Sequence, residues 1–188
     1  EPVLHFRVEG NYLHHRDKQD GDWNRFIVKG VNLGVALPGK FPGEFAMSYQ
    51  QYYSAIADIA CMNANVIRIY TILPPLFYRA LADYNSDSVH AKMYLMQGIW
   101  ATDPKEGNYR NPKFTGAFIQ EAQDAINVLH GNAQLRKKPG KAYGNYTADI
   151  SRYVCGIILG REWEPASVHR TNQKYDEPVY HGDYIHVN

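Results

Sequence analysis

The chain has 188 residues, of which 45% are hydrophobic, and this length suits one domain with a substantial core. Its 20 lysine and arginine residues almost balance its 19 aspartate and glutamate residues. A chain without a basic excess is not expected to bind nucleic acid or an anionic membrane surface. No apolar run approaches the roughly 20 residues that a membrane span requires, so no membrane span is expected in this segment.

The side chains that usually bind metals are scattered along the chain. The histidines lack the helical i, i+4 spacing around a glutamate that marks a zinc hydrolase. Cys61 and Cys155 each lie inside an apolar run, so we expect two buried structural thiols rather than a metal site or a disulfide. We therefore expect no metal and no other cofactor.

The first residues have the pattern of a β-hairpin. Leu4, Phe6 and Val8 alternate with polar residues, which is the period of a half-buried strand. A polar turn over residues 17–22 separates this segment from the apolar residues 23–28. The sequence therefore predicts an N-terminal β-hairpin over residues 1–25 that leads into a second region, residues 26–188.

The second region alternates short apolar runs with amphipathic segments. Predicted strands cover residues 26–33, 65–70, 93–99 and 154–159. Predicted helices run from the capping residue Ser48 to about Met62, over residues 76–84, and over residues 114–130 with Gly131 just beyond the end. A polar loop containing the charged segment 136–141 precedes the last strand, and the tail after that strand has no clear period.

This alternation predicts an α/β fold with a parallel sheet, because the strands are nearly continuously apolar. Such a parallel sheet can close into a barrel or remain open as a doubly wound sheet. The glycines at 30 and 34 lack the G-x-G-x-x-G spacing, which disfavours a dinucleotide site.

The predicted strand ends carry polar and aromatic residues. In a parallel barrel the functional groups lie at the carboxyl ends of the strands. A carboxylate pair, two tryptophans, two amides and arginines form a set that suits sugar binding, although an ordinary polar rim would look similar. The residues are Asn32, Arg68, Tyr70, Gln97, Trp100, Arg161, Glu162, Trp163 and Glu164.

Three segments also resemble a known enzyme group. NVIRIY at residues 65–70, followed by the prolines at 74 and 75, resembles the second barrel strand of family 2 glycoside hydrolases, the β-galactosidase and β-glucuronidase group. VCGIILGREWEP at residues 154–165 is similar to the fourth strand of the wider clan-A superfamily, and FIVKGVN at residues 26–32 is similar to its first strand. The resemblance covers roughly residues 23–165 in the expected order.

The resemblance implies the N-terminal half, about four β/α units, of a (β/α)8 TIM barrel that binds a carbohydrate substrate. By position, Glu162 matches the general acid/base and Arg68 matches an arginine that supports the site. Asn32, Trp100, Trp163 and Glu164 stand where sugar-contacting residues are found. The clan's nucleophile follows the seventh strand, so this chain is expected to be a fragment that does not hydrolyse glycosides alone.

One residue departs from the clan pattern. Arg161 stands where the clan has an asparagine that bonds the sugar 2-hydroxyl. A fixed positive charge beside the acid would lower its pKa and weaken a group that must remain protonated. Either an unusual substrate or lost catalysis would explain this residue.

Three functions follow as hypotheses. The first is a glycoside hydrolase that cleaves a β-linked sugar by a two-carboxylate, retaining mechanism. The others are a non-catalytic carbohydrate-binding barrel and a structural barrel module of a larger protein. Open edges on the first and fourth strands predict either self-association or coverage by the tail residues Tyr175, Tyr180 and Tyr184.

Overall fold

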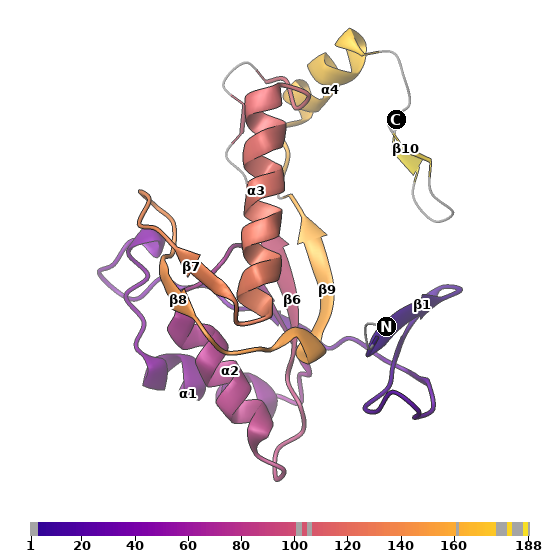
Figure 1. Ribbon diagram of the computed structural model, residues 1–188, viewed down its shortest axis with the longest axis vertical. Helices are drawn as coiled ribbons and strands as arrows, with labels where there is room; N and C mark the ends of the chain where they lie inside the picture. The colour runs from indigo at the N-terminus through magenta and orange to yellow at the C-terminus, as the bar shows by residue number, and fades with distance from the viewer. Residues whose placement is uncertain are drawn as a thin grey trace.

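A four-stranded parallel sheet forms the centre of the protein (Figure 1). The computed structural model describes residues 4–100, 103–104, 107–160 and 162–175, with the backbone of residues 180–181 and 186–187. The strands lie side by side in chain order: β4 (Gly30–Asn32), β5 (Val66–Ile69), β6 (Tyr94–Ile99) and β9 (Val154–Leu159). Each neighbouring pair is parallel. The predicted α/β class and the predicted fourth strand are therefore confirmed.

Three helices pack on one face of this sheet: α1 (Tyr49–Cys61), α2 (Pro75–Ser86) and α3 (Pro112–Leu129). Their apolar residues share one core with Ile67, Ile69 and Leu95 of the sheet. Burial of this common face is the main source of stability, because removing apolar surface from water contributes about 25 cal/mol per Å². The three predicted helices are thus present, with ends shifted by one to a few residues.

Two of the predicted helix ends, at Ser48 and Gly131, have the expected capping geometry. The Ser48 backbone N–H donates to Gln51 Oε1 at 2.8 Å, and the Gln51 N–H donates back to Ser48 Oγ at 3.3 Å, which completes a capping box on α1. Gly131 follows α3 with a φ of +63°. Only glycine adopts this left-handed conformation at low cost, so it serves as the helix stop.

The N-terminal residues form an antiparallel sheet rather than the predicted hairpin. Strands β1 (Phe6–Glu9) and β2 (Tyr12–His15) pair around a turn at Gly10, and β3 (Asn24–Arg25) pairs with β2. The prediction paired the opening strand with residues 23–28 and missed β2, whose sequence YLHH lacks a clear apolar alternation. Phe26 continues this sheet by donating its N–H to Leu13, and this leaves β4 shorter than predicted.

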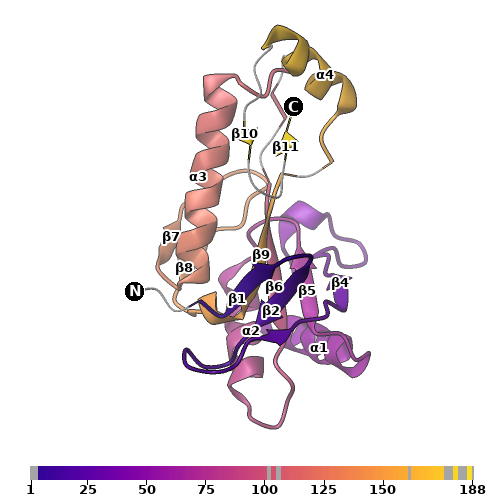
Figure 2. The same cartoon turned by 90° about the vertical axis from the view of Figure 1, so that its right-hand side faces the viewer.

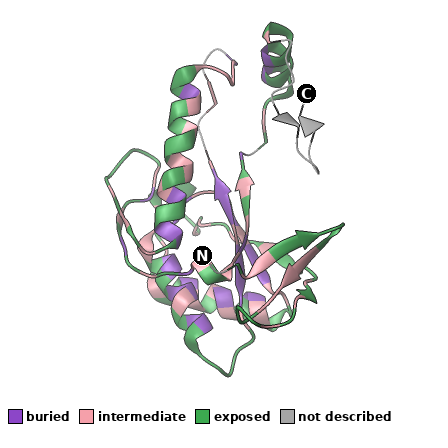
Figure 3. Ribbon diagram, turned by 45° about the vertical axis from the view of Figure 1, so that its right-hand side comes forward, coloured by how far each residue is buried: buried purple, intermediate pink, exposed green. Residues whose placement is uncertain are grey.

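The N-terminal sheet covers the start of the parallel strands on the face opposite the helices. Phe6, Leu13 and Phe26 pack against Val66, Tyr94 and Cys155. Figure 2 shows β1 and β2 lying across this end of the parallel sheet, and Figure 3 shows that their outer surface is largely exposed. The other end of the same face has no such cover among the described residues.

Two further elements were not predicted. The segment expected to be a loop holds an antiparallel pair, β7 (Ala133–Leu135) with β8 (Gly144–Tyr146). The segment after β9 forms α4 (Pro165–Lys174), and short strands β10 (Tyr180–His181) and β11 (His186–Val187) pair beyond it. Two 3-10 turns, η1 (Pro42–Glu44) and η2 (Ser151–Tyr153), complete the elements.

The tail tyrosine that the structure describes in full does not cover the parallel sheet. The Tyr175 hydroxyl accepts a bond from Asn108 Nδ2 at 3.3 Å, so this tail residue packs on the loop before α3 and not on the sheet. The Tyr180 and Tyr184 side chains lie outside the described residues.

Burial raises the pKa of the Cys155 thiol to about 12, as expected for a structural thiol. Cys61 is exposed, which corrects the prediction, because it lies on the outer side of α1.

His15 makes the packing of the N-terminal sheet sensitive to pH. Its ring lies among Phe6, Phe26 and Tyr94, with Nε2 3.1 Å from the Tyr94 hydroxyl oxygen. Burial lowers the pKa of His15 below its ordinary 6.5, and Asp17 opposes this shift while His5 and Arg152 add to it.

We expect the protein to lose stability as the pH falls below the unfolded-state pKa of His15, about 6.5. In that range the unfolded chain binds a proton that the folded chain resists, so unfolding becomes more favourable as the solution is acidified. Urea midpoints measured between about pH 5 and pH 7.5 should rise with pH. The plot of urea midpoint against pH should have a shallower slope in a His15→Phe variant, which keeps a ring but cannot titrate. An identical slope in the two proteins would show that His15 does not contribute.

Candidate functional site

Two of the predicted site residues meet on the face of the sheet opposite the helices. The register places Asn32, Arg68, Met96 and Gly156 in one row across the four strands. Arg68 Nη1 donates to Asn32 Oδ1 at 3.4 Å. This hydrogen bond holds the Arg68 guanidinium at the carboxyl ends of β4 and β5, where the N-terminal strands do not cover the sheet.

Tyr70 joins this cluster from the residue after β5. The Arg68 guanidinium carbon lies 4.5 Å from the centre of the Tyr70 ring, within the range of a cation–π contact. Arg68 Nε is buried and has no hydrogen-bond partner among the described residues. A buried N–H without an acceptor lowers the stability of the fold. This arginine is therefore well placed to bind an oxygen atom of a carboxylate or of a ligand.

Gln97, which the sequence placed among the candidate site residues, lies away from Arg68 and Asn32 and is bonded within the core. Its side chain is 0% exposed and points toward the helices. Its Oε1 accepts a bond from the Tyr78 hydroxyl at 2.9 Å, and its Nε2 donates to the Gly98 carbonyl at 2.9 Å. The position of Gln97 near the end of a strand does not determine its face of the sheet, since alternate residues point to opposite sides.

Trp163 packs inside the protein's own aromatic cluster. Its ring lies 4.4 Å from the Tyr109 ring, and about 6 Å from Phe114 and Phe118. A side chain at Gly160, where φ is +82°, would collide with the indole, so the ring lies directly over this glycine. The observed packing uses the ring to join the end of β9 to α3, and a sugar would have to compete with these contacts.

The two glutamates follow β9 and are both exposed. Glu162 lies in a bend, and none of the described residues forms a hydrogen bond or ion pair with its carboxylate. Glu164 is the N-cap residue of α4. Because β9 ends at Leu159 and the chain turns at Gly160, strand alternation does not set the direction of either side chain. Arg161 lies outside the described residues.

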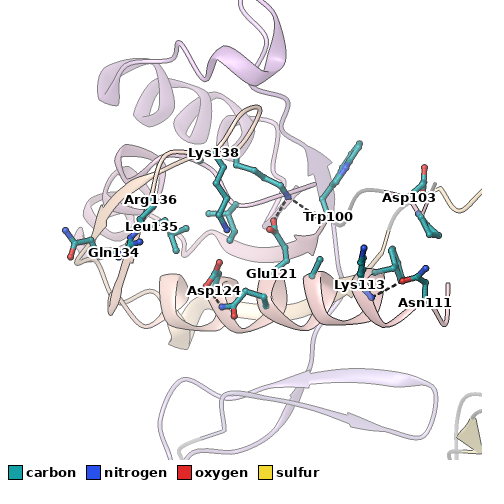
Figure 4. Close-up of a pocket in the computed structure, with 17 residues that line it drawn as sticks. Trp100, Asp103, Asn111, Lys113, Glu121, Asp124, Gln134, Leu135, Arg136 and Lys138 are labelled. Carbon is teal, nitrogen blue, oxygen red and sulfur yellow. Dashed lines mark hydrogen bonds and ion pairs between the residues drawn. The ribbon is translucent and has the colours of Figure 1, made fainter. Parts of the chain in front are cut away.

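Trp100 lies at the mouth of a groove between α3 and the β7–β8 pair. Its carbonyl accepts a bond of 2.8 Å from Lys141 Nζ, and the same ammonium donates to Glu121 Oε1 at 2.9 Å (Figure 4). The groove has a volume of about 770 Å³. No local pattern predicted this groove, because the segment 136–141 has the composition of a solvated loop.

The described residues contain no group of three or more histidine, cysteine, aspartate or glutamate side chains placed to hold a metal ion. Among the helices that the structure describes, none combines the length and apolar character needed to cross a bilayer. No protein-family model matches this chain, and neither a curated protein nor a solved structure matches it. The site must therefore be interpreted from its own chemistry.

Proposed function

We propose that the four parallel strands are the first half of a (β/α)8 barrel. The supporting observation is the strand order β4, β5, β6, β9 with α1, α2 and α3 packed on one face. A doubly wound sheet reverses its strand order and places helices on both faces. A sheet whose right-handed crossovers all lie on one side can bury its other face by closing on itself.

The outer side of β9 supports continuation of the sheet. Ile157 and Leu159 point to the helix side, in register with Gln97 and Ile99, yet they are 40% and 66% exposed. Adjacent large apolar side chains at a sheet edge usually lie under another element. In a closed barrel, the helix and strand that follow β9 would cover them.

We infer that such a barrel is a glycoside hydrolase acting on a β-linked sugar. Glu162 follows the fourth strand, at the end of the sheet where barrel enzymes carry their catalytic groups. In the proposed reaction, the Glu162 carboxyl protonates the glycosidic oxygen while a second carboxylate attacks the anomeric carbon. Glu162 then removes a proton from the water that hydrolyses the glycosyl–enzyme bond, which regenerates both carboxyl groups.

The four described strands would supply only one of the two carboxylates. The proposal therefore requires a nucleophile from a strand of the second half, and the present chain alone is proposed to be inactive. Arg68 would support that nucleophile, because its buried Nε–H has no acceptor within the described part of the chain. Asn32, Tyr70 and Trp100 remain proposed substrate contacts, as do Arg161 and Glu164, which lie on either side of Glu162 and Trp163 in the sequence.

The direct test compares Glu162→Gln with Glu164→Gln in a protein that contains all eight strands. We expect Glu162→Gln to slow hydrolysis of unactivated β-glycosides about a hundredfold to ten-thousandfold, which is the usual contribution of general acid–base catalysis. Glu164→Gln, two residues away and also exposed, removes a proposed sugar contact and not the acid, so it should change KM more than kcat.

A folded eight-strand protein that binds oligosaccharide but turns over no glycoside would contradict the hydrolase and favour the non-catalytic carbohydrate-binding barrel. Loss of activity in Glu164→Gln alone would instead move the acid to Glu164. A protein that neither binds nor hydrolyses glycans would leave the structural module as the best interpretation.

A further inference from the structure

The groove beside α3 is a defined surface and not a gap under a loose loop. The β7–β8 pair that forms one wall is anchored at several points. Lys141 bridges the end of β6 and α3, through Trp100 and Glu121. The Tyr146 hydroxyl donates to the Leu73 carbonyl at 2.9 Å and is buried. These contacts hold the hairpin at a fixed distance from the helix.

The helix wall carries charges of both signs, and the hairpin wall is basic. The wall from α3 contributes Lys113, Glu121 and Asp124, while the hairpin wall contributes Arg136, Lys138 and Lys141. Figure 4 shows Glu121 and Asp124 across the groove from Arg136 and Lys138. Glu121 is already paired with Lys141. The Asp124 carboxylate accepts a bond from Gln120 Nε2 at 2.9 Å, which fixes it near the middle of the helix wall.

Amide side chains and apolar surface complete the lining. The amides can both donate and accept hydrogen bonds. They come from both walls, and the apolar residues lie between them. The amides are Asn111, Gln120 and Gln134, and the apolar residues include Phe114, Ala117 and Leu135.

The charged, amide and apolar residues of the groove together favour one class of ligand. A ligand with a net charge of either sign would meet like charges on one wall. Hydroxyl groups suit both walls, because each can donate to a carboxylate and accept from an ammonium or guanidinium. The C–H faces of a pyranose ring would pack on the apolar residues. A volume of about 770 Å³ falls within the range of ligand sites and leaves room for several linked rings.

We propose that this groove binds a neutral, linear oligosaccharide. It is separate from Glu162, since its walls are α3 and the β7–β8 pair, and Trp100 at its mouth belongs to the end of β6. A chain lying in the groove would leave it at the carboxyl end of the parallel sheet. The inference rests on the groove alone and does not require the chain to be part of an active hydrolase.

Calorimetric titration of this chain with cellohexaose, laminarihexaose and mannohexaose tests the proposal. We expect at least one hexasaccharide to bind. The double variant Asp124→Ala/Gln134→Ala should weaken that binding about tenfold, because it removes one polar partner from each wall. Gln123→Ala is the matched control, since this residue of α3 is exposed and outside the groove lining. Circular dichroism would establish that each variant is folded.

Two results would overturn the proposal. One is the absence of binding to all three hexasaccharides by the folded chain, or binding that the double variant leaves unchanged. The other is binding of the zwitterionic peptide tetra-alanine at the same residues without any sugar binding, which would assign the groove's charges of both signs to a peptide ligand. Because these tests measure binding, they can fail while the hydrolysis test of Glu162 succeeds, and the reverse also holds.

Discussion

Replacing Gly98 with alanine should destabilise the protein by about 3 kcal/mol or more, the upper part of the range for overpacked sites. Gly98 lies in β6 beside the end of β5. A Cβ at this position would lie 2.5 Å from the Tyr70 carbonyl oxygen and 2.6 Å from that of Ile69. Both are backbone atoms of a neighbouring chain segment, so they cannot move away without distorting β5. Urea unfolding of the two proteins measures the difference.

Gly156→Ala is the matched control for this variant. Gly156 lies in β9 and pairs with Met96, but a Cβ there would meet only the flexible Met96 side chain, at 3.7 Å. We expect a change within about 1 kcal/mol, because the new methyl group makes an ordinary contact. If both glycines tolerated alanine equally, the close approach of β5 and β6 at Gly98 would be wrong.

Replacing Gln97 with alanine should cost about 2–4 kcal/mol of stability, in the range of large-to-small substitutions in a core. The substitution opens a cavity in the core and leaves the buried Tyr78 hydroxyl without its 2.9 Å acceptor. A double-mutant cycle with Tyr78→Phe should show that the two effects are not additive, because both variants break the same hydrogen bond. Thermal or urea unfolding supplies the four values.

This experiment also decides the role of Gln97. A residue whose side chain serves a ligand would affect binding and leave the stability of the unliganded protein nearly unchanged. A stability loss below about 0.5 kcal/mol, the level of an ordinary surface substitution, would therefore return Gln97 to the candidate site.

The sequence predicted the parallel sheet well because its strands and helices carry strong local patterns. The run at residues 154–159 is apolar throughout and is bounded by Gly160, and the structure has β9 over the same residues. The capping pair Ser48 and Gln51 likewise marks the start of α1. Such signals come from a few adjacent residues, so they can be interpreted without knowing the tertiary structure.

The missed elements lack these local signals. Helix α4 has Pro165 at its first position but no apolar stripe, and only Ser167 and Thr171 are buried on it. Strands β7 and β8 are each three residues long and gain their position from long-range contacts, including the Tyr146 bond to Leu73. Their formation depends on partners far away in the sequence.

The candidate site was predicted in part for a related reason. Strand ends identified Asn32, Arg68 and Tyr70, which the structure brings together. The position of a residue near a strand end does not specify which face of the sheet it occupies, and Gln97 lies on the face that packs against the helices. It also does not show how a chain leaves the strand, and the turn at Gly160 sends Trp163 back onto α3.

Glu162 is proposed to donate a proton to a glycosidic oxygen, and the most direct test of this role is how the rate of hydrolysis depends on the leaving group. Hydrolysis of phenyl and dinitrophenyl β-glycosides would be compared for the eight-strand protein and its Glu162→Gln variant. We expect a large loss with the phenyl glycosides and little loss with the dinitrophenyl glycosides, which leave without protonation. An equal loss with both substrates, or no loss with either, would contradict the assignment of Glu162 as the catalytic acid.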